Sequence, residues 1–261
     1  MKRASLNNVA IVLSLLGLLT NASTAAEWGS VKGRFVVDGA PPKLEPLQIT
    51  KDVEYCTGKK PVNETVVVGK DGGLANVVVF IRLPRNGKVA VHPDYEAKLS
   101  EPAVLDNNGC SFKPHITLVR VGQPFIIKNS DPVGHNTKAS LVNNGQFNVT
   151  IAAGMETKTP LNRAETIPLP VNCNIHPWMQ AHVLVQDHPY MAATGDDGSF
   201  EIANVPAGKH EFQLWHEAAG YLKNVKYKGG AADRRGRAGL TIAAGHTLDL
   251  GDIKVPASSL K

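Results

Sequence analysis

Short apolar stretches alternate with polar, turn-forming residues along nearly all of the chain after residue 26. The stretches are rich in β-branched residues and bounded by Gly, Pro, Asn or Asp, a pattern typical of strands joined by turns. No long stretch has the period of an amphipathic helix. We therefore expect an all-β protein of packed sandwiches, with a helical turn or two near residues 94–100. The predicted strands are residues 31–37, 65–68, 76–83, 116–121, 125–128, 147–151, 182–185, 200–202, 210–215 and 240–242.

The first 26 residues have a different pattern. Lys2 and Arg3 precede an apolar run at residues 9–20, and small residues follow it. This order is typical of a secretory signal peptide, and the run is shorter than the roughly 20 residues that span a bilayer. We expect residues 1–26 to be removed, which leaves a mature chain with no membrane span in the periplasm or outside the cell. The alternative is an uncleaved membrane anchor.

The length of the chain, 261 residues, exceeds what one small β-sandwich needs and suggests two modules. We expect a first module at residues 27–188, including an N-terminal extension at 29–44, and a second at 189–261. The second begins with Asp-Asp-Gly, a hairpin signal, followed by a strand, Pro-Ala-Gly and another strand. This arrangement resembles the carboxypeptidase-regulatory-like domain, a small sandwich of transthyretin type.

The most specific chemistry lies near the end of the first module. Cys173, His176 and Met179 fall within the stretch Cys-Asn-Ile-His-Pro-Trp-Met, and His135 lies upstream in the sequence His-Asn. Two imidazoles, a thiolate and a thioether are the ligands of a blue-copper site, in which the Met is a weak axial ligand. Structural zinc sites use Cys and His without a thioether. The set therefore favours copper. The alternative is a buried Cys, two hydrogen-bonded histidines and a core Met with no metal.

Residues around these four have plausible supporting roles. Asn136 could tie the two ligand-bearing segments together through its side chain. The apolar residues 125–127 and Trp178 would exclude water from the metal, and Pro177 would stiffen the ligand loop.

The stretch 122–131, the following His-Asn and the Cys-x2-His-Pro-x-Met loop resemble a cupredoxin, and the short loop is most similar to that of amicyanin and related methylamine-utilisation proteins. The resemblance implies a Greek-key β-sandwich with one type 1 copper held by His135, Cys173, His176 and Met179. It also implies that His176 reaches the surface as the port for electrons. The implied function is transfer of single electrons between extracytoplasmic redox partner proteins.

The other two cysteines, Cys56 and Cys110, could form a disulfide in an oxidising compartment or remain two free buried thiols. Without Lys2 and Arg3 the formal charge falls from +5 to +3, which gives no indication of nucleic-acid binding. Basic residues do gather between 223 and 237. They form either a solvated loop or a face that attracts an acidic partner.

We expect no enzymatic activity. The chain has no His-x-His pair of the kind found in multicopper oxidases, and no zincin or Gly-x-Ser-x-Gly motif. We expect His115, His182, His188 and His216 to be structural, hydrogen-bonded histidines. For His182 and His188, which lie close to the ligand loop in the sequence, the alternative is a second metal site or a proton-linked role. The alternative functions are a copper-binding module without electron transfer, or a module that binds proteins or glycans. The sequence leaves the oligomeric state open.

Overall fold

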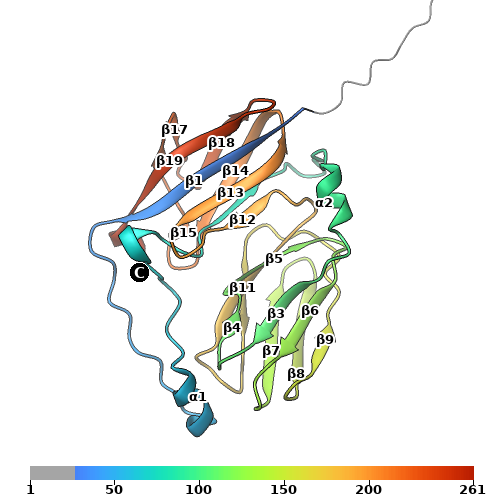
Figure 1. Cartoon of the computed structure of the whole chain (residues 1–261), viewed down its shortest axis with the longest axis vertical. Helices are drawn as coiled ribbons and strands as arrows, with labels where there is room; N and C mark the ends of the chain where they lie inside the picture. Colours follow the sequence, from blue (N-terminus) through green and yellow to red (C-terminus); the bar gives the residue numbers. More distant parts are fainter. Residues whose placement is uncertain (1–26) are drawn as a thin grey trace, which may run out of the picture.

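The computed structural model describes residues 27–261 (Figure 1). The predicted signal peptide lies outside these residues. The all-β prediction is confirmed, because strands dominate and the described residues hold only two short α-helices, α1 (Val53–Lys59) and α2 (Pro93–Ala97), with 3₁₀ turns η1 (Lys70–Gly72) and η2 (Ala257–Ser259). The predicted helical turns near 94–100 correspond to α2. No helix in this part of the chain has the length and apolar character that crossing a bilayer requires.

One β-sandwich, here called the central sandwich, is built from the middle of the chain. Its two sheets pack around a single apolar core that includes Phe112, Phe125 and Val183. The first sheet has the order β5 (Ile116–Arg120), β11 (Gln180–Gln186), β10 (Leu169–Asn172), β7 (His135–Leu141), β8 (Gly145–Ile151). The second has the order β4 (Phe112–Lys113), β3 (Ala103–Asn107), β6 (Phe125–Asn129), β9 (Glu156–Lys158).

The terminal sandwich combines strands from both ends of the chain around a second core that contains Phe35, Phe212 and Ile253. One sheet has the order β13 (Ser199–Pro206), β1 (Trp28–Asp38), β19 (Thr247–Pro256). The other has the order β12 (Met191–Ala193), β2 (Val78–Ile81), β14 (Gly208–His216), β15 (Gly220–Tyr221), with β18 (Arg237–Ile242) also paired to β14. A small hairpin of β16 (Lys226–Tyr227) and β17 (Gly230–Ala231) lies apart from these sheets.

The sheets divide the chain differently from the predicted boundary between residues 188 and 189. β1 pairs with β13 and β19, and β2 pairs with β12 and β14, so both N-terminal strands belong to the terminal sandwich. The central sandwich is thus inserted between β2 and β12. The predicted strand at 65–68 is wrong, since this segment makes only an isolated bridge from Val68 to Leu74. The strands β3, β7, β10 and β19 were not predicted, and neither were the short strands β4, β9, β12, β15, β16 and β17.

The two sandwiches pack against each other through β2, β5, β11 and β14. All four residues of β2 are buried. Val79 and Ile81 enter the terminal core, whereas Val78 and Phe80 point the other way and meet Leu184 of the central sandwich. A strand buried on both faces loses the usual alternation of apolar and polar residues, which explains the unbroken apolar sequence.

A long excursion connects β1 to β2. The chain leaves the terminal sandwich, runs down beside the central sandwich to α1 and returns (Figure 1). A disulfide between Cys56 of α1 and Cys110 fixes the helix there, which confirms the pairing that the sequence left open. The excursion brings residues from the first quarter of the chain to the candidate metal ligands.

Candidate metal centre

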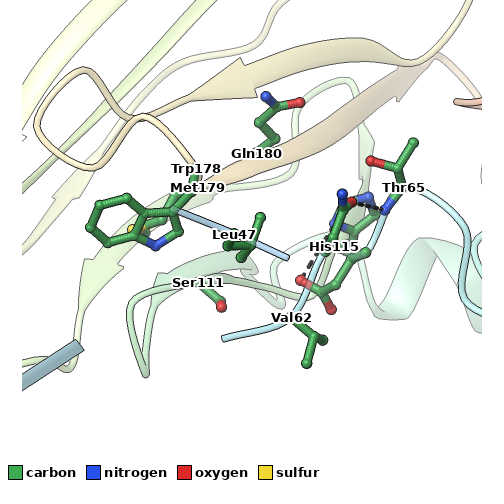
Figure 2. Close-up of a pocket in the computed structure, with 10 residues that line it drawn as sticks. Leu47, Val62, Thr65, Ser111, His115, Trp178, Met179 and Gln180 are labelled. Atoms are coloured by element: carbon green, nitrogen blue, oxygen red, sulfur yellow. Dashed lines mark hydrogen bonds and ion pairs between the residues drawn. The ribbon is translucent and has the colours of Figure 1, made fainter. Parts of the chain in front are cut away.

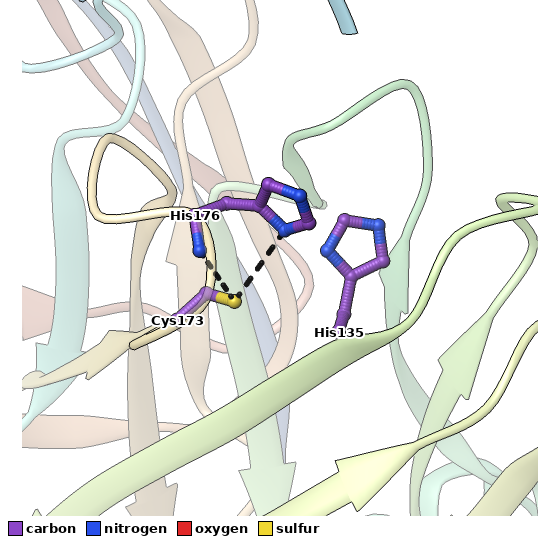
Figure 3. A group of neighbouring side chains, drawn as sticks. All are labelled: His135, Cys173 and His176. Carbon is purple, nitrogen blue, oxygen red and sulfur yellow. Dashed lines mark hydrogen bonds between the residues drawn. The ribbon is translucent and has the colours of Figure 1, made fainter. Parts of the chain in front are cut away.

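Three of the four predicted ligands converge at one end of the central sandwich. His135 begins β7, Cys173 directly follows β10, and His176 lies in the turn before β11. The ligand atoms of the three residues all lie within 4.8 Å of one another. Nδ1 of His176 is 3.9 Å from Sγ of Cys173, and the two imidazole centroids are 4.5 Å apart (Figure 3). All three side chains are buried.

The arrangement leaves one nitrogen without a partner. Nδ1 of His135 is buried and makes no hydrogen bond, while Nε2 of the same ring is 2.9 Å from Asp131. Figure 3 shows a nitrogen of His135 turned toward His176 and Cys173. A buried polar atom with no partner is costly, and two imidazole nitrogens with a thiolate are a donor set that suits copper. The residues therefore fit the implied metal.

Asn136 ties the two ligand-bearing segments together, as expected. Its Oδ1 accepts hydrogen bonds from the backbone N–H groups of Asn174 (2.6 Å) and Ile175 (3.2 Å). Its Nδ2 donates to Oδ1 of Asn148 on β8 at 2.6 Å. The start of β7 thus holds the ligand loop in place through one side chain.

Met179 closes the ligand loop. Its backbone N–H donates to the carbonyl of His176 at 2.9 Å, and its carbonyl accepts from the N–H of Cys173 at 3.2 Å. The N–H of His176 in turn points at Sγ of Cys173, 3.3 Å away. The Met179 side chain is buried in the same apolar cluster as Cys173.

Asp131 accepts a hydrogen bond from Nε2 of His135, on the side of the ring opposite the other candidate ligands. This role was not predicted from the sequence. The carboxylate of Asp131 also accepts hydrogen bonds from the N–H groups of Gly109 and Cys110 and from the hydroxyl of Tyr55 in α1. Burial alone would raise the pKa of Asp131, but the hydrogen bond to His135 and the two N–H donors outweigh it and lower the pKa to about 2. In the sequence, the only indication of this contact is that Asp131 lies four positions before His135.

Asp52 covers His176, which corrects the expectation of a surface-exposed electron port. Oδ2 of Asp52 is 2.8 Å from Nε2 of His176, and the imidazole is fully buried. Asp52 immediately precedes α1, so the disulfide-anchored helix places it there. No sequence pattern indicates this contact, because the two residues are 124 positions apart.

The site alters the ionisation of its own groups. Burial would raise the pKa of Cys173, but the neighbouring imidazoles of His135 and His176 and the backbone N–H groups around the sulfur lower it to about 6. For His135, burial would lower the pKa, but Asp131 and Cys173 raise it to about 9. The thiol is therefore ready to bind a metal at neutral pH.

Two of the remaining histidines act as expected. His188 is hydrogen-bonded to the carbonyl of Ile81 at 3.0 Å, and Nδ1 of His216 accepts from the N–H of Ala218 at 3.2 Å. Burial lowers the pKa of His182 and of His216 to about 4, so both are neutral at physiological pH.

No protein-family model and no curated protein matches the chain in sequence. Among solved structures, a variant of amicyanin in its reduced Cu(I) form is 19% identical, with a TM-score of 0.30 over 33% of this chain and 83% of amicyanin. A purple cupredoxin from Nitrosopumilus maritimus is 21% identical, with a TM-score of 0.27 over 32% of this chain and 97% of that protein. The copper-containing nitrite reductase of Thermus scotoductus is 19% identical, with a TM-score of 0.30 over 32% of this chain and only 22% of the reductase.

Proposed function

We propose that the chain is an exported protein that binds one copper ion and transfers single electrons between extracytoplasmic partner proteins. Cys173, His135 and His176 would hold the ion, and Met179 would complete the set with its thioether, which are the donor types of a type 1 site. The observation that supports this most directly is the buried, unpartnered Nδ1 of His135, which faces a low-pKa thiol and a second imidazole.

The surrounding residues prepare these ligands. Asp131 and Asp52 each accept a hydrogen bond from Nε2 of one histidine, so Nδ1 is the nitrogen of each ring that would bind the ion. Because the pKa of His135 is raised to about 9, copper binding at neutral pH would displace a proton from that ring. Asn136 fixes the loop that carries Cys173 and His176. When bound, copper supplies a one-electron couple. A rigid set of ligands changes little between the two oxidation states, which favours fast electron transfer.

We propose electron transfer rather than catalysis for this centre. Catalytic metal sites keep a position open for water or substrate. Here His135, Cys173, His176 and Met179 are all at most 2% exposed. Trp178 packs edge-on against His176, with centroids 5.1 Å apart, and is itself only half-buried. It therefore provides a route for electrons from the covered histidine toward solvent.

A second candidate function is copper binding for storage or delivery without electron transfer. The observation that favours it is the cover over His176, because Asp52 blocks the edge of the imidazole from a docking partner. The two functions predict different rates of electron self-exchange. Fast self-exchange supports electron transfer, whereas slow self-exchange together with easy loss of copper to a chelator supports storage or delivery.

The first experiment is to add Cu(II) to the mature protein and record optical and EPR spectra. An intense thiolate-to-copper absorption with narrow copper hyperfine splitting would support the type 1 centre. The Cys173→Ser variant should lose that absorption, whereas His246→Asn, which removes an exposed histidine, should keep it. A colourless wild-type protein with an ordinary type 2 signal would contradict the proposal.

A further inference from the structure

A second group of potential ligands lies where the two sandwiches meet. His115 precedes β5, His182 is in β11, and Glu217 directly follows β14 of the terminal sandwich. One ligand atom from each of the three lies within 4.8 Å of the others. Nε2 of His115 contacts Oε1 of Glu217, and Nδ1 of His182 is 3.7 Å from Oε2 of the same carboxylate. A fourth side chain, Glu64, comes from the excursion that carries α1, and its Oε2 is 3.7 Å from Nδ1 of His115.

The alternation of the strands explains why these side chains meet. In β11, Val183 and Val185 point into the central core, so Leu184 and His182 face the terminal sandwich. In β14, Phe212 and Leu214 point into the terminal core, so Trp215 faces the central sandwich. Glu217 lies two positions beyond Trp215, on the same side. Trp215 packs against the His182 ring with centroids 5.1 Å apart.

Two nitrogen atoms of this cluster have no hydrogen-bond partner within the protein. Nδ1 of His115 and Nδ1 of His182 are both buried and have no hydrogen-bond partner. Their nearest carboxylate oxygens, at 3.7 Å, are too far away for hydrogen bonds. Two ligands that share one ion at about 2.0–2.2 Å each are roughly 3–4 Å apart, which is close to the separation between His182 and Glu217. Nε2 of His115 and Oε1 of Glu217 are closer than this, so an ion would separate these two atoms on binding. A pure ion pair between His115 and Glu217 would leave His182 without a partner.

We propose that His115, His182 and Glu217 form a second metal site, which binds a divalent transition-metal ion such as Zn(II) or Cu(II). Nε2 of His115, Nδ1 of His182 and a carboxylate oxygen of Glu217 are the ligands. Oε2 of Glu64 lies 3.7 Å from the other nitrogen of His115, so its charge faces the ring from the side away from the ion, where carboxylates are often found behind metal-bound histidines. Two imidazoles and one carboxylate are a set that zinc and copper accept, and they leave a fourth position for water or a small anion.

A pocket reaches the His115 edge of this site and the end of the ligand loop of the first centre. It encloses about 110 Å³ and is lined by residues from both places, including Glu64, His115, Trp178, Met179 and Gln180 (Figure 2). Met179 and His182 are three positions apart at the start of β11, which corresponds to roughly 10 Å along an extended chain. An ion can therefore approach His115 and Glu64 from the pocket.

The test uses the mature protein with Cys173→Ala, so that binding at the first centre does not interfere. Titration with Zn(II) by calorimetry should show one tightly bound ion. Adding Glu217→Gln or His182→Asn should weaken the affinity at least 100-fold, because each removes one of only three ligands. His246→Asn in the same background should bind zinc as the parent does. His246 is exposed, lies in the turn between β18 and β19, and does not belong to the cluster.

A second measurement does not depend on the Glu217 and His182 variants being stable. X-ray absorption of the Zn(II)-loaded Cys173→Ala protein should show nitrogen and oxygen ligands with scattering from two imidazoles. Absence of tight zinc binding, or an affinity that neither Glu217→Gln nor His182→Asn changes in folded protein, would overturn the proposal. Both outcomes are separate from the function proposed for the first centre, because Cys173 is absent throughout.

Discussion

The carboxylate of Asp52 accepts a hydrogen bond from Nε2 of His176 at 2.8 Å, across 124 positions of sequence. The contact joins the first quarter of the chain to the ligand loop of the candidate copper centre. It fixes which nitrogen of His176 carries the proton, and it removes the imidazole from solvent. A loop that would present an exposed histidine on its own is therefore closed by a second segment.

Asp52→Ala should weaken copper binding and speed electron exchange. Removing a carboxylate that supports a metal-bound histidine typically reduces metal affinity about 10–100-fold. The same change uncovers His176, so electron self-exchange should rise. Competition with a chelator measures the affinity, and NMR line broadening in mixtures of oxidised and reduced protein measures the exchange rate.

The matched control for this change is Glu54→Ala. Glu54 is exposed in the first turn of the same helix and makes no contact with the ligands. Its removal changes the net charge by the same amount, so both quantities should stay at their wild-type values. If the two variants behave alike, the effect is one of overall charge and Asp52 has no special role.

Removing the disulfide with Cys56→Ala and Cys110→Ala together should destabilise the protein and loosen the copper site. The two cysteines are 54 positions apart, and for a loop of that length the chain-entropy relation gives about 4 kcal/mol. The released helix carries Asp52 and Tyr55, which support the two histidines. Urea denaturation should show the loss of stability, and limited proteolysis should show new cleavage near α1. Unchanged copper affinity in the folded double variant would mean that α1 stays in place without the bond.

The candidate ligands could be predicted from the sequence because three of them are local. Cys173, His176 and Met179 lie in one short loop, so their types and spacing alone indicate a metal. Strands such as β5 and β6 could be predicted for a similar reason, since each has its own apolar pattern between turn residues.

What the sequence could not indicate depends on contacts between distant segments. β1 was assigned to the wrong module, because its partners β13 and β19 lie more than 150 positions later. Asp52 and Glu217 are ordinary acidic residues in the sequence and gain a role only when the fold brings them to a histidine. The exposed port expected for His176 was wrong for the same reason.

Asn136→Ala should disorder the ligand loop without removing any ligand. Its Oδ1 accepts hydrogen bonds from two partly buried backbone N–H groups of the loop, and leaving both unpaired should cost about 1–3 kcal/mol in total. We expect a lower melting temperature and a broader, weaker thiolate-to-copper absorption. Asn148→Ala is the control, because Asn148 contacts only the Nδ2 end of Asn136 among the hydrogen bonds described, and its loss leaves the loop N–H groups paired. Equal effects of the two variants would contradict the role given to Oδ1.

The thiol of Cys173 should ionise in the metal-free protein with a pKa of about 6, well below the ordinary thiol value of about 8.5. Because folding lowers this pKa, the thiolate stabilises the folded state fully above about pH 8.5, and the contribution is lost as the pH falls through 6. Ultraviolet thiolate absorbance of the metal-free protein measures the midpoint directly. His135→Ala should move the midpoint upward, since His135 makes the largest of the contacts that lower the pKa, whereas the distant His210→Asn should leave it unchanged. A wild-type midpoint near 8.5 would show that the histidines do not stabilise the thiolate before a metal binds.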